Sequence, residues 1–139
     1  MKYKYSVVPG QLDIGGRVTR RPVVEVEISN GKVARKFLAL IDSGADQITM
    51  PAAIAEALGI DRAACKTRSV FGISMEHSEG FVAELSFRLR NQASSFTAPV
   101  IFIDTDVPVL LGREGFFDHH RIRFEQDHDT FAIAPINRQ

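Results

Sequence analysis

An aspartate at the end of an apolar run is the residue of this sequence best suited to do chemistry. Residues 38–51 read LALIDSGADQITMP, so Asp42 follows a strand-like segment and precedes a small Ser-Gly-Ala turn. An aspartate at such a place can simply accept hydrogen bonds from its own turn, because Asp-Ser-Gly is good turn chemistry in any protein. It can also act as a general acid or base in hydrolysis, if a second carboxyl group is held beside it.

A second apolar run ends at a glycine about seventy residues further along the chain. Residues 107–111 read VPVLL, and Gly112 and Arg113 follow them. Each run has the short, continuous apolar character of a strand in a buried sheet. The sequence therefore contains two strand ends, LIDSGA and LLGR, that are separated by a strand-rich stretch.

The two elements, in this order, resemble the signature of the retropepsin-like aspartic peptidases, and the resemblance extends over roughly residues 23–124. It implies a mostly β fold, a closed retropepsin-like barrel with one or two short helices. It also implies an aspartic endopeptidase, which hydrolyses peptide bonds with a water molecule activated between two carboxylates. Two such carboxylates, held close together, share one proton because both cannot ionise at once.

The resemblance also implies roles for particular residues. Asp42 corresponds to the catalytic aspartate, while Ser43, Gly112 and Arg113 support the site. An ion pair between Asp46 and Arg113 is expected beneath it. The residues that correspond to the substrate-binding positions, three of them in a flap between two strands, are Gly44, Ala45, Asp46, Gly72, Ile73, Ser74 and Leu110.

The second catalytic aspartate has to come from another copy of the chain. The Asp-Thr pair at Asp104-Thr105 is followed by Asp106 where the motif requires glycine. A two-lobed enzyme with both halves in one chain would need about twice this length. The expected active form is therefore a homodimer with Asp42 and its symmetry mate on the twofold axis.

The elements that position these residues can be predicted from hydrophobic periodicity and turn signals. Asn30-Gly31 predicts a hairpin with a type I′ turn, which needs positive φ at both central residues. Helices are predicted over residues 51–58, with Gly59 at the C-terminal cap, and over residues 113–120. About nine strands are expected, at residues 3–8, 22–29, 33–41, 67–73, 80–90, 97–103, 107–111, 121–125 and 130–134.

Composition limits the other possibilities. With 139 residues and no linker-like stretch, a single domain over residues 1–139 is expected. Lys and Arg together number 17, equal to Asp and Glu, which argues against nucleic acid or a membrane as a partner. One cysteine rules out an intrachain disulfide, and no long apolar run is present, so a cytoplasmic location is expected. A removed targeting or anchoring segment is left open.

Two alternatives to a peptidase site remain. The histidines and acids of residues 118–129 suggest a metal site, but their spacing favours a solvated chain end, so neither metal nor cofactor is expected. A non-catalytic module is the more serious alternative, with the retropepsin fold used for dimerisation or peptide binding. The peptidase interpretation predicts a protein or peptide substrate and cleavage that depends on Asp42.

Overall fold

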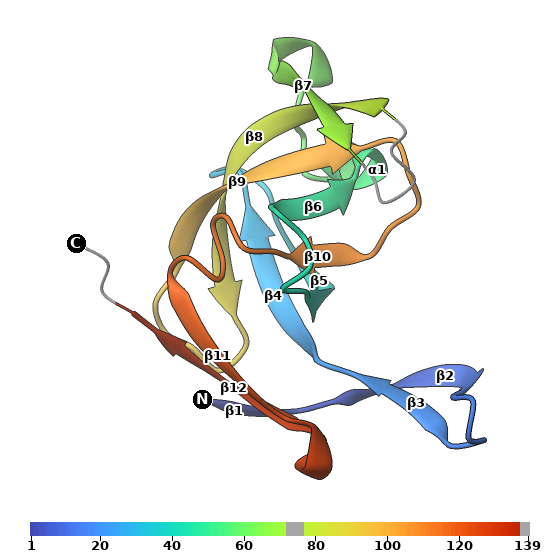
Figure 1. Cartoon of the computed structure of the whole chain (residues 1–139). Coiled ribbons are helices and arrows are strands. Elements are labelled where there is room, and N and C mark those ends of the chain that lie inside the picture. Colours follow the sequence, from blue (N-terminus) through green and yellow to red (C-terminus); the bar gives the residue numbers. More distant parts are fainter. Residues whose placement is uncertain (72–76, 137–139) are drawn as a thin grey trace.

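The computed structural model describes residues 1–71 and 77–136 (Figure 1). The predominance of strands agrees with the predicted fold class. The elements are β1 Lys2–Lys4, β2 Ser6–Leu12, β3 Val18–Arg21, β4 Val23–Ser29, β5 Ala34–Ile41, β6 Ile48–Pro51, α1 Ala52–Ala57, the 3₁₀ turn η1 Arg62–Ala64, β7 Lys66–Phe71, β8 His77–Leu89, β9 Phe96–Ile103, β10 Val109–Leu111, β11 His120–Glu125, the 3₁₀ turn η2 Gln126–His128 and β12 Thr130–Pro135.

Six strands close into a barrel. Their order is β4-β5-β10-β6-β9-β8, and pairing of β4 with β8 closes the ring, while β7 lies outside β8. Strand β10 is parallel to β5 and antiparallel to β6, so it lies between two strands that precede it in the sequence. The closed, mostly β barrel predicted from the sequence is confirmed.

Alternating side chains fill the barrel. In β4, Val24, Val26 and Ile28 are buried, whereas the intervening residues are only half-buried. In β8 the same two-residue period directs Phe81 and Phe87 into the barrel. The Phe81 ring stacks on that of Phe102 in β9, with 5.0 Å between the ring centroids. The period of two is the property of a strand with one buried face, and it accounts for the good prediction of these strands.

The hairpin between β4 and β5 is present, but its predicted turn type is wrong. Gly31 has φ of 99°, whereas Asn30 does not have positive φ. The Asn30 side chain instead accepts hydrogen bonds from the backbone of Lys32 and Val33, each at 2.9 Å. A type I′ turn would need positive φ at both central residues, so the asparagine stabilises a longer connection through its side chain.

The predicted helix over residues 113–120 is also wrong. This segment is a series of turns, and Gly115 has φ of 89°, outside the range of an α-helix. A Cβ at Gly115 would lie 2.9 Å from that of Ala98, which leaves room only for glycine. The helix α1 does form, over Ala52–Ala57, and its C-cap is Leu58. Gly59, predicted at the cap, follows directly with φ of 71° and turns the chain out of the helix.

The N-terminal region differs from the single strand predicted over residues 3–8. Strand β1 pairs with β12, and Tyr5 donates its backbone N–H to Asp129 at 2.7 Å. The chain then leaves this sheet as β2, which pairs with the unpredicted β3 (Figure 1). Strand β3 reads VTRR and has no apolar alternation, so its sequence contained no strand signal.

Candidate active site

Strand β5 carries Asp42 to the surface of the barrel. Ala39 and Ile41 are buried, and the chain emerges at Asp42, which is half-buried. The backbone N–H of Asp42 donates to the Leu111 carbonyl of β10 at 3.1 Å. Two strands from distant parts of the sequence thus fix the position of the Asp42 backbone, from which its carboxylate projects.

The turn after Asp42 orients its carboxylate. Gly44 donates its N–H to Asp42 Oδ1 at 2.9 Å, and Ala45 donates its N–H to the Asp42 carbonyl at 3.2 Å. A Cβ on Gly44 would lie 3.2 Å from the same Oδ1, so a side chain there would crowd the carboxylate. Ser43 is exposed within this turn. The carboxylate is therefore held by its own turn on one side.

Gly112 allows the two site segments to approach each other. A Cβ at this residue would lie 2.2 Å from the Gln47 carbonyl oxygen and 2.6 Å from that of Ala45. Directly after it, Arg113 donates its N–H to the Ala45 carbonyl at 2.9 Å. The glycine at the end of the second motif is thus needed for backbone contact, not for a special φ angle.

Asp46 and Arg113 form the expected ion pair. Both side chains are largely exposed, at 70% and 59% respectively. Glu114 also donates its N–H to the Asp46 carbonyl at 2.8 Å, and Gln47 forms a parallel bridge with Glu114. The two motifs are therefore joined by backbone hydrogen bonds as well as by the side-chain pair.

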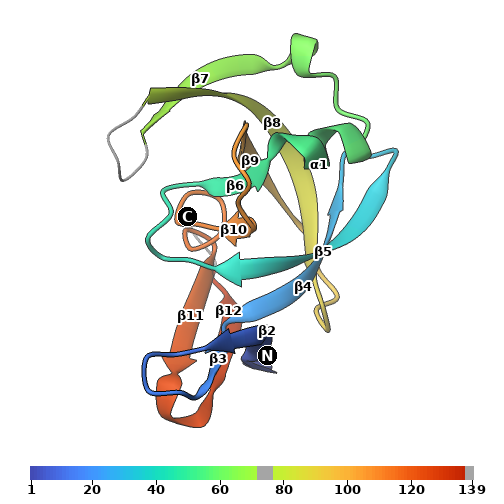
Figure 2. The same ribbon diagram turned by 90° about the vertical axis from the view of Figure 1, so that its right-hand side faces the viewer.

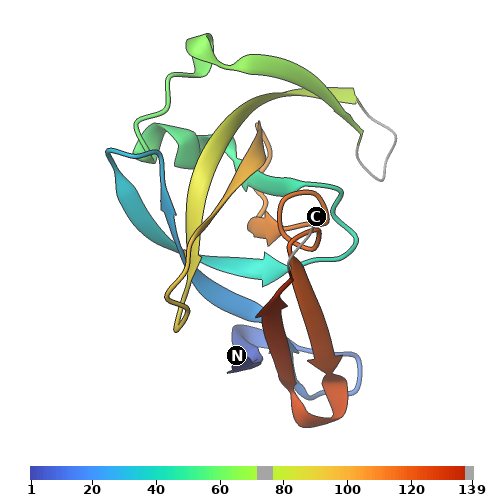
Figure 3. The same cartoon turned by 90° about the vertical axis from the view of Figure 1, so that its left-hand side faces the viewer.

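Leu110 lies in β10 between the two neighbouring strands. It is opposite Leu40 of β5 and Thr49 of β6, and its side chain is half-buried. The predicted flap residues Gly72, Ile73 and Ser74 lie outside the described residues. The described part of that hairpin pairs β7 with β8 and projects on the same side as the segment between β5 and β6 (Figures 2 and 3).

Sequence reasoning missed one contact beside these elements. Arg62 donates two hydrogen bonds to the Asp104 carboxylate, at 2.9 and 2.7 Å, and its guanidinium lies 4.6 Å from the centroid of the Phe81 ring. Hydrogen bonding from Arg62 holds the pKa of Asp104 below its ordinary value. The contact joins η1, which precedes β7, to the segment between β9 and β10, and a separation of 42 residues has no sequence signal.

The histidine and acid residues near the C-terminus are dispersed. His120 is buried, and its Nδ1 lies 2.8 Å from the Phe116 carbonyl oxygen. Since a carbonyl can only accept, Nδ1 carries the proton. Within residues 1–71 and 77–136, no group of three or more His, Cys, Asp or Glu side chains is placed to hold a metal ion. In the same part of the chain no helix is long and apolar enough to cross a membrane.

Comparison with known proteins agrees with this geometry. A retropepsin-like aspartic protease from Rickettsia conorii is 19% identical, with a TM-score of 0.58 over 95% of this chain and 99% of that one. EIAV protease, in complex with the inhibitor HBY-793, is 19% identical, with a TM-score of 0.51 over 67% of this chain and 82% of that one. These likenesses identify the retropepsin fold. No curated protein matched the sequence. Residues 12–114 match the family described as aspartyl protease, and the chain therefore belongs to that family.

Proposed function

We propose that the protein is an aspartic endopeptidase whose active site forms when two copies bring their Asp42 carboxylates together. The observation that carries the proposal is the position of Asp42, which a turn and two strands hold at the barrel surface. Membership of the aspartyl protease family supports a hydrolase of this type. The chain has one Asp-Ser-Gly motif, so a pair of such carboxylates requires a second copy.

The proposed chemistry follows from two carboxyl groups that share a proton. The ionised carboxylate accepts a proton from a water molecule, whose oxygen attacks the carbonyl carbon of the peptide. The protonated carboxyl donates to the carbonyl oxygen, as in aspartic proteases as a class. Collapse of the tetrahedral intermediate breaks the C–N bond, and the amine leaves with a proton from a carboxyl group.

The remaining site residues have supporting roles in this proposal. Gly44 and Ala45 are small and leave space beside the carboxylate, and exposed Ser43 is free to donate a hydrogen bond across the dimer axis. Leu110 lines a pocket for a substrate side chain, and the hairpin of β7 and β8 covers the bound peptide. Closure of such a hairpin excludes water from the reaction. The Asp46–Arg113 pair stabilises the base of the site.

The proposal is tested with wild type, Asp42→Asn and the control Glu84→Gln, which changes an exposed acid on β8. Each is sedimented and is then incubated with a peptide library between acidic and neutral pH. Wild type and Glu84→Gln are expected to form dimers and to cleave the same peptides. Asp42→Asn is expected to form a dimer and to cleave at least about a thousandfold more slowly, because it lacks the acid–base pair.

Two outcomes would count against the peptidase. A wild-type protein that stays monomeric and cleaves nothing would instead support a non-catalytic module. Cleavage that persists undiminished in Asp42→Asn would assign the activity to other residues or to a contaminant.

A further inference from the structure

Strands β2 and β3 form an arm that pairs with no other strand of the described chain. They make a two-stranded sheet in which Ser6 is opposite Arg21 and Leu12 is opposite Val18. The arm, defined as residues 6–21, extends away from the barrel in Figure 1. A two-stranded hairpin alone is marginally stable in water, and packing against another surface is its usual source of stability.

The arm exposes apolar side chains along its length. The exposed fractions are 50% for Val7, 63% for Leu12, 109% for Ile14 and 47% for Val18. Single exposed apolar residues are ordinary, but a gathering of aliphatic side chains on one projecting element is typical of an interaction surface. The composition of the arm thus indicates that another surface covers it.

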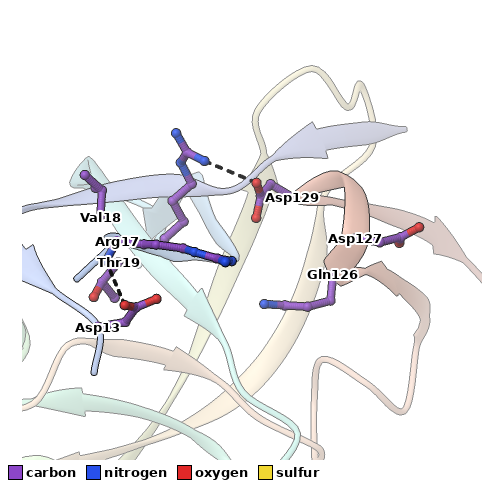
Figure 4. A pocket seen from close by; sticks show the side chains of 8 residues that line it. Asp13, Arg17, Val18, Thr19, Gln126, Asp127 and Asp129 are labelled. Carbon is purple, nitrogen blue, oxygen red and sulfur yellow. Dashed lines mark hydrogen bonds and ion pairs between the residues drawn. The ribbon is translucent and has the colours of Figure 1, made fainter. Parts of the chain in front are cut away.

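A cleft separates the arm from the turn between β11 and β12. Arg20 and Asp129 span its mouth with an ion pair at 3.2 Å, and the cleft has a volume of about 760 Å³ (Figure 4). Clefts of this size can hold a small ligand. The residues that line it are Asp13, Arg17, Val18, Thr19, Arg20, Gln126, Asp127 and Asp129.

The two sides of this cleft have opposite net charge. The arm has three arginines and one aspartate, a net charge of +2, whereas residues 125–129 have three acids and a neutral histidine, a net charge of −3. The whole chain is neutral, so this separation is local. Arg20 already pairs with Asp129 of its own chain, so the arm charges that are left to face the acidic turn of another copy are those of Arg17 and Arg21. Opposite patches of this kind guide association.

The arm also lies on the side where a second copy is needed. In Figures 2 and 3, the arm and the segment between β5 and β6, which carries Asp42, project on the same side of the barrel. Strand β1 pairs with β12 on one side and is the edge strand of the sheet β1-β12-β11, so the outer edge of this terminal sheet is a second surface within reach of another copy. A second copy that is related by a twofold axis through the Asp42 site would therefore also lie close to the arm.

We propose that the arm is the main dimerisation element, in which each copy lays residues 6–21 across its twin. The contact is isologous: Leu12, Ile14 and Val18 of each arm are covered by the other copy, and the basic arm faces the partner's acidic turn. This inference rests on the proposed function, because it names the surface that joins the two halves of that active site.

The test compares a double variant, Leu12→Ser with Ile14→Ser, with the control Leu38→Ser. Leu38 is 68% exposed but lies on the barrel wall. The arm variant is expected to raise the dimer dissociation constant by about a hundredfold, because two aliphatic side chains are no longer buried. The control is expected to dimerise like wild type. Sedimentation equilibrium measures both constants, and circular dichroism verifies that each chain is folded.

A second measurement locates the contact without substitution. In wild type, amide hydrogen exchange at residues 12–18 is expected to slow as the protein concentration rises through the dissociation constant. Exchange at these residues that does not change with concentration would overturn the proposal.

The outcomes separate this inference from the proposed function. If the arm variant is monomeric and inactive, and recovers activity at high concentration, both stand. If it remains a dimer and cleaves normally, the arm proposal fails and the peptidase proposal stands. If wild type is dimeric through the arm but inactive, the arm proposal stands and the peptidase proposal fails.

Discussion

Gly112 illustrates a requirement at the scale of single residues. Glycine is often explained by positive φ, but Gly112 is needed because two backbone carbonyls lie where a Cβ would be. The Ala45 carbonyl is one of these, and it also accepts the N–H of Arg113. The close approach of the segments after Asp42 and after β10 therefore depends on the absence of one side chain.

Gly112→Ala is expected to lower the free energy of unfolding by about 3 kcal/mol or more, because carbonyl groups of the backbone cannot move aside cheaply. Gly15→Ala is the matched control, since its Cβ would meet only the Asp13 carboxylate at 3.4 Å. The control should change stability by less than about 1 kcal/mol. Urea unfolding measures both, and equal losses would show that the contact at Gly112 relaxes easily.

At the scale of elements, the start of β11 is held by a buried histidine. His120 stacks on Phe116 at 4.7 Å between ring centroids and meets Phe96 edge-on at the same distance. Burial lowers the pKa of His120 from its ordinary value, and the nearby His119 acts in the same direction, although the Phe116 carbonyl opposes them. The neutral ring is thus part of the packing between β9, β11 and the turns before β11.

This packing predicts a loss of stability in acid. Since the pKa is lower in the folded chain, the unfolded chain binds more protons as the pH falls below about 6.5. The contribution of neutral His120 is therefore present at higher pH and is lost in acid. In His120→Asn the fall in unfolding free energy between pH 7.5 and 5 should be smaller than in wild type.

The comparison for that variant is His128→Asn, which changes an exposed histidine. Thermal or urea unfolding of the three proteins over this pH range provides the measurement. If the unfolding free energy of His120→Asn falls with pH as steeply as that of wild type, the acid sensitivity comes from carboxylates and not from His120. The result also bears on the peptidase assays, because activity lost in acid can come from unfolding.

At the scale of the whole molecule, one chain supplies one carboxylate of the proposed pair. The barrel closes without help from a second copy, because β4 pairs with β8. Folding and assembly of the active site are therefore separate requirements in this proposal. An intact barrel can be inactive, and the dimer is where activity is expected to be controlled.

Mixing of wild type with Asp42→Asn tests this separation. Random exchange of subunits should produce mixed dimers with one catalytic carboxyl group, and these should be inactive. At equal amounts of the two chains, activity per wild-type chain should fall by about half, because half of the wild-type chains are in mixed dimers. Glu84→Gln in place of Asp42→Asn should cause no loss. Activity that is insensitive to the inactive chain would point to a catalytic monomer.

Several features could be predicted from the sequence because their causes are local. The alternation in β4 and β8 reflects one buried face, and Gly59 turns the chain away just after the C-cap of α1 because it can adopt positive φ. Failures occurred where distant contacts outweigh local preference. Residues 113–120 contain helix-forming types, yet Gly115 packs against Ala98 of β9 and turns the chain.

The sequence by itself determined which residues are suited to chemistry: Asp42, its small neighbours and the LLGR segment, since residue type and spacing are written in the chain. Only the tertiary structure decided how they meet. It placed Leu111 beside Asp42 and Gly112 against Gln47, and it separated the arm from the barrel. The physical reason is that β5 pairs with β10 across about seventy residues of sequence, and no local pattern records such a contact. The exposure of the arm likewise depends on how the rest of the chain packs.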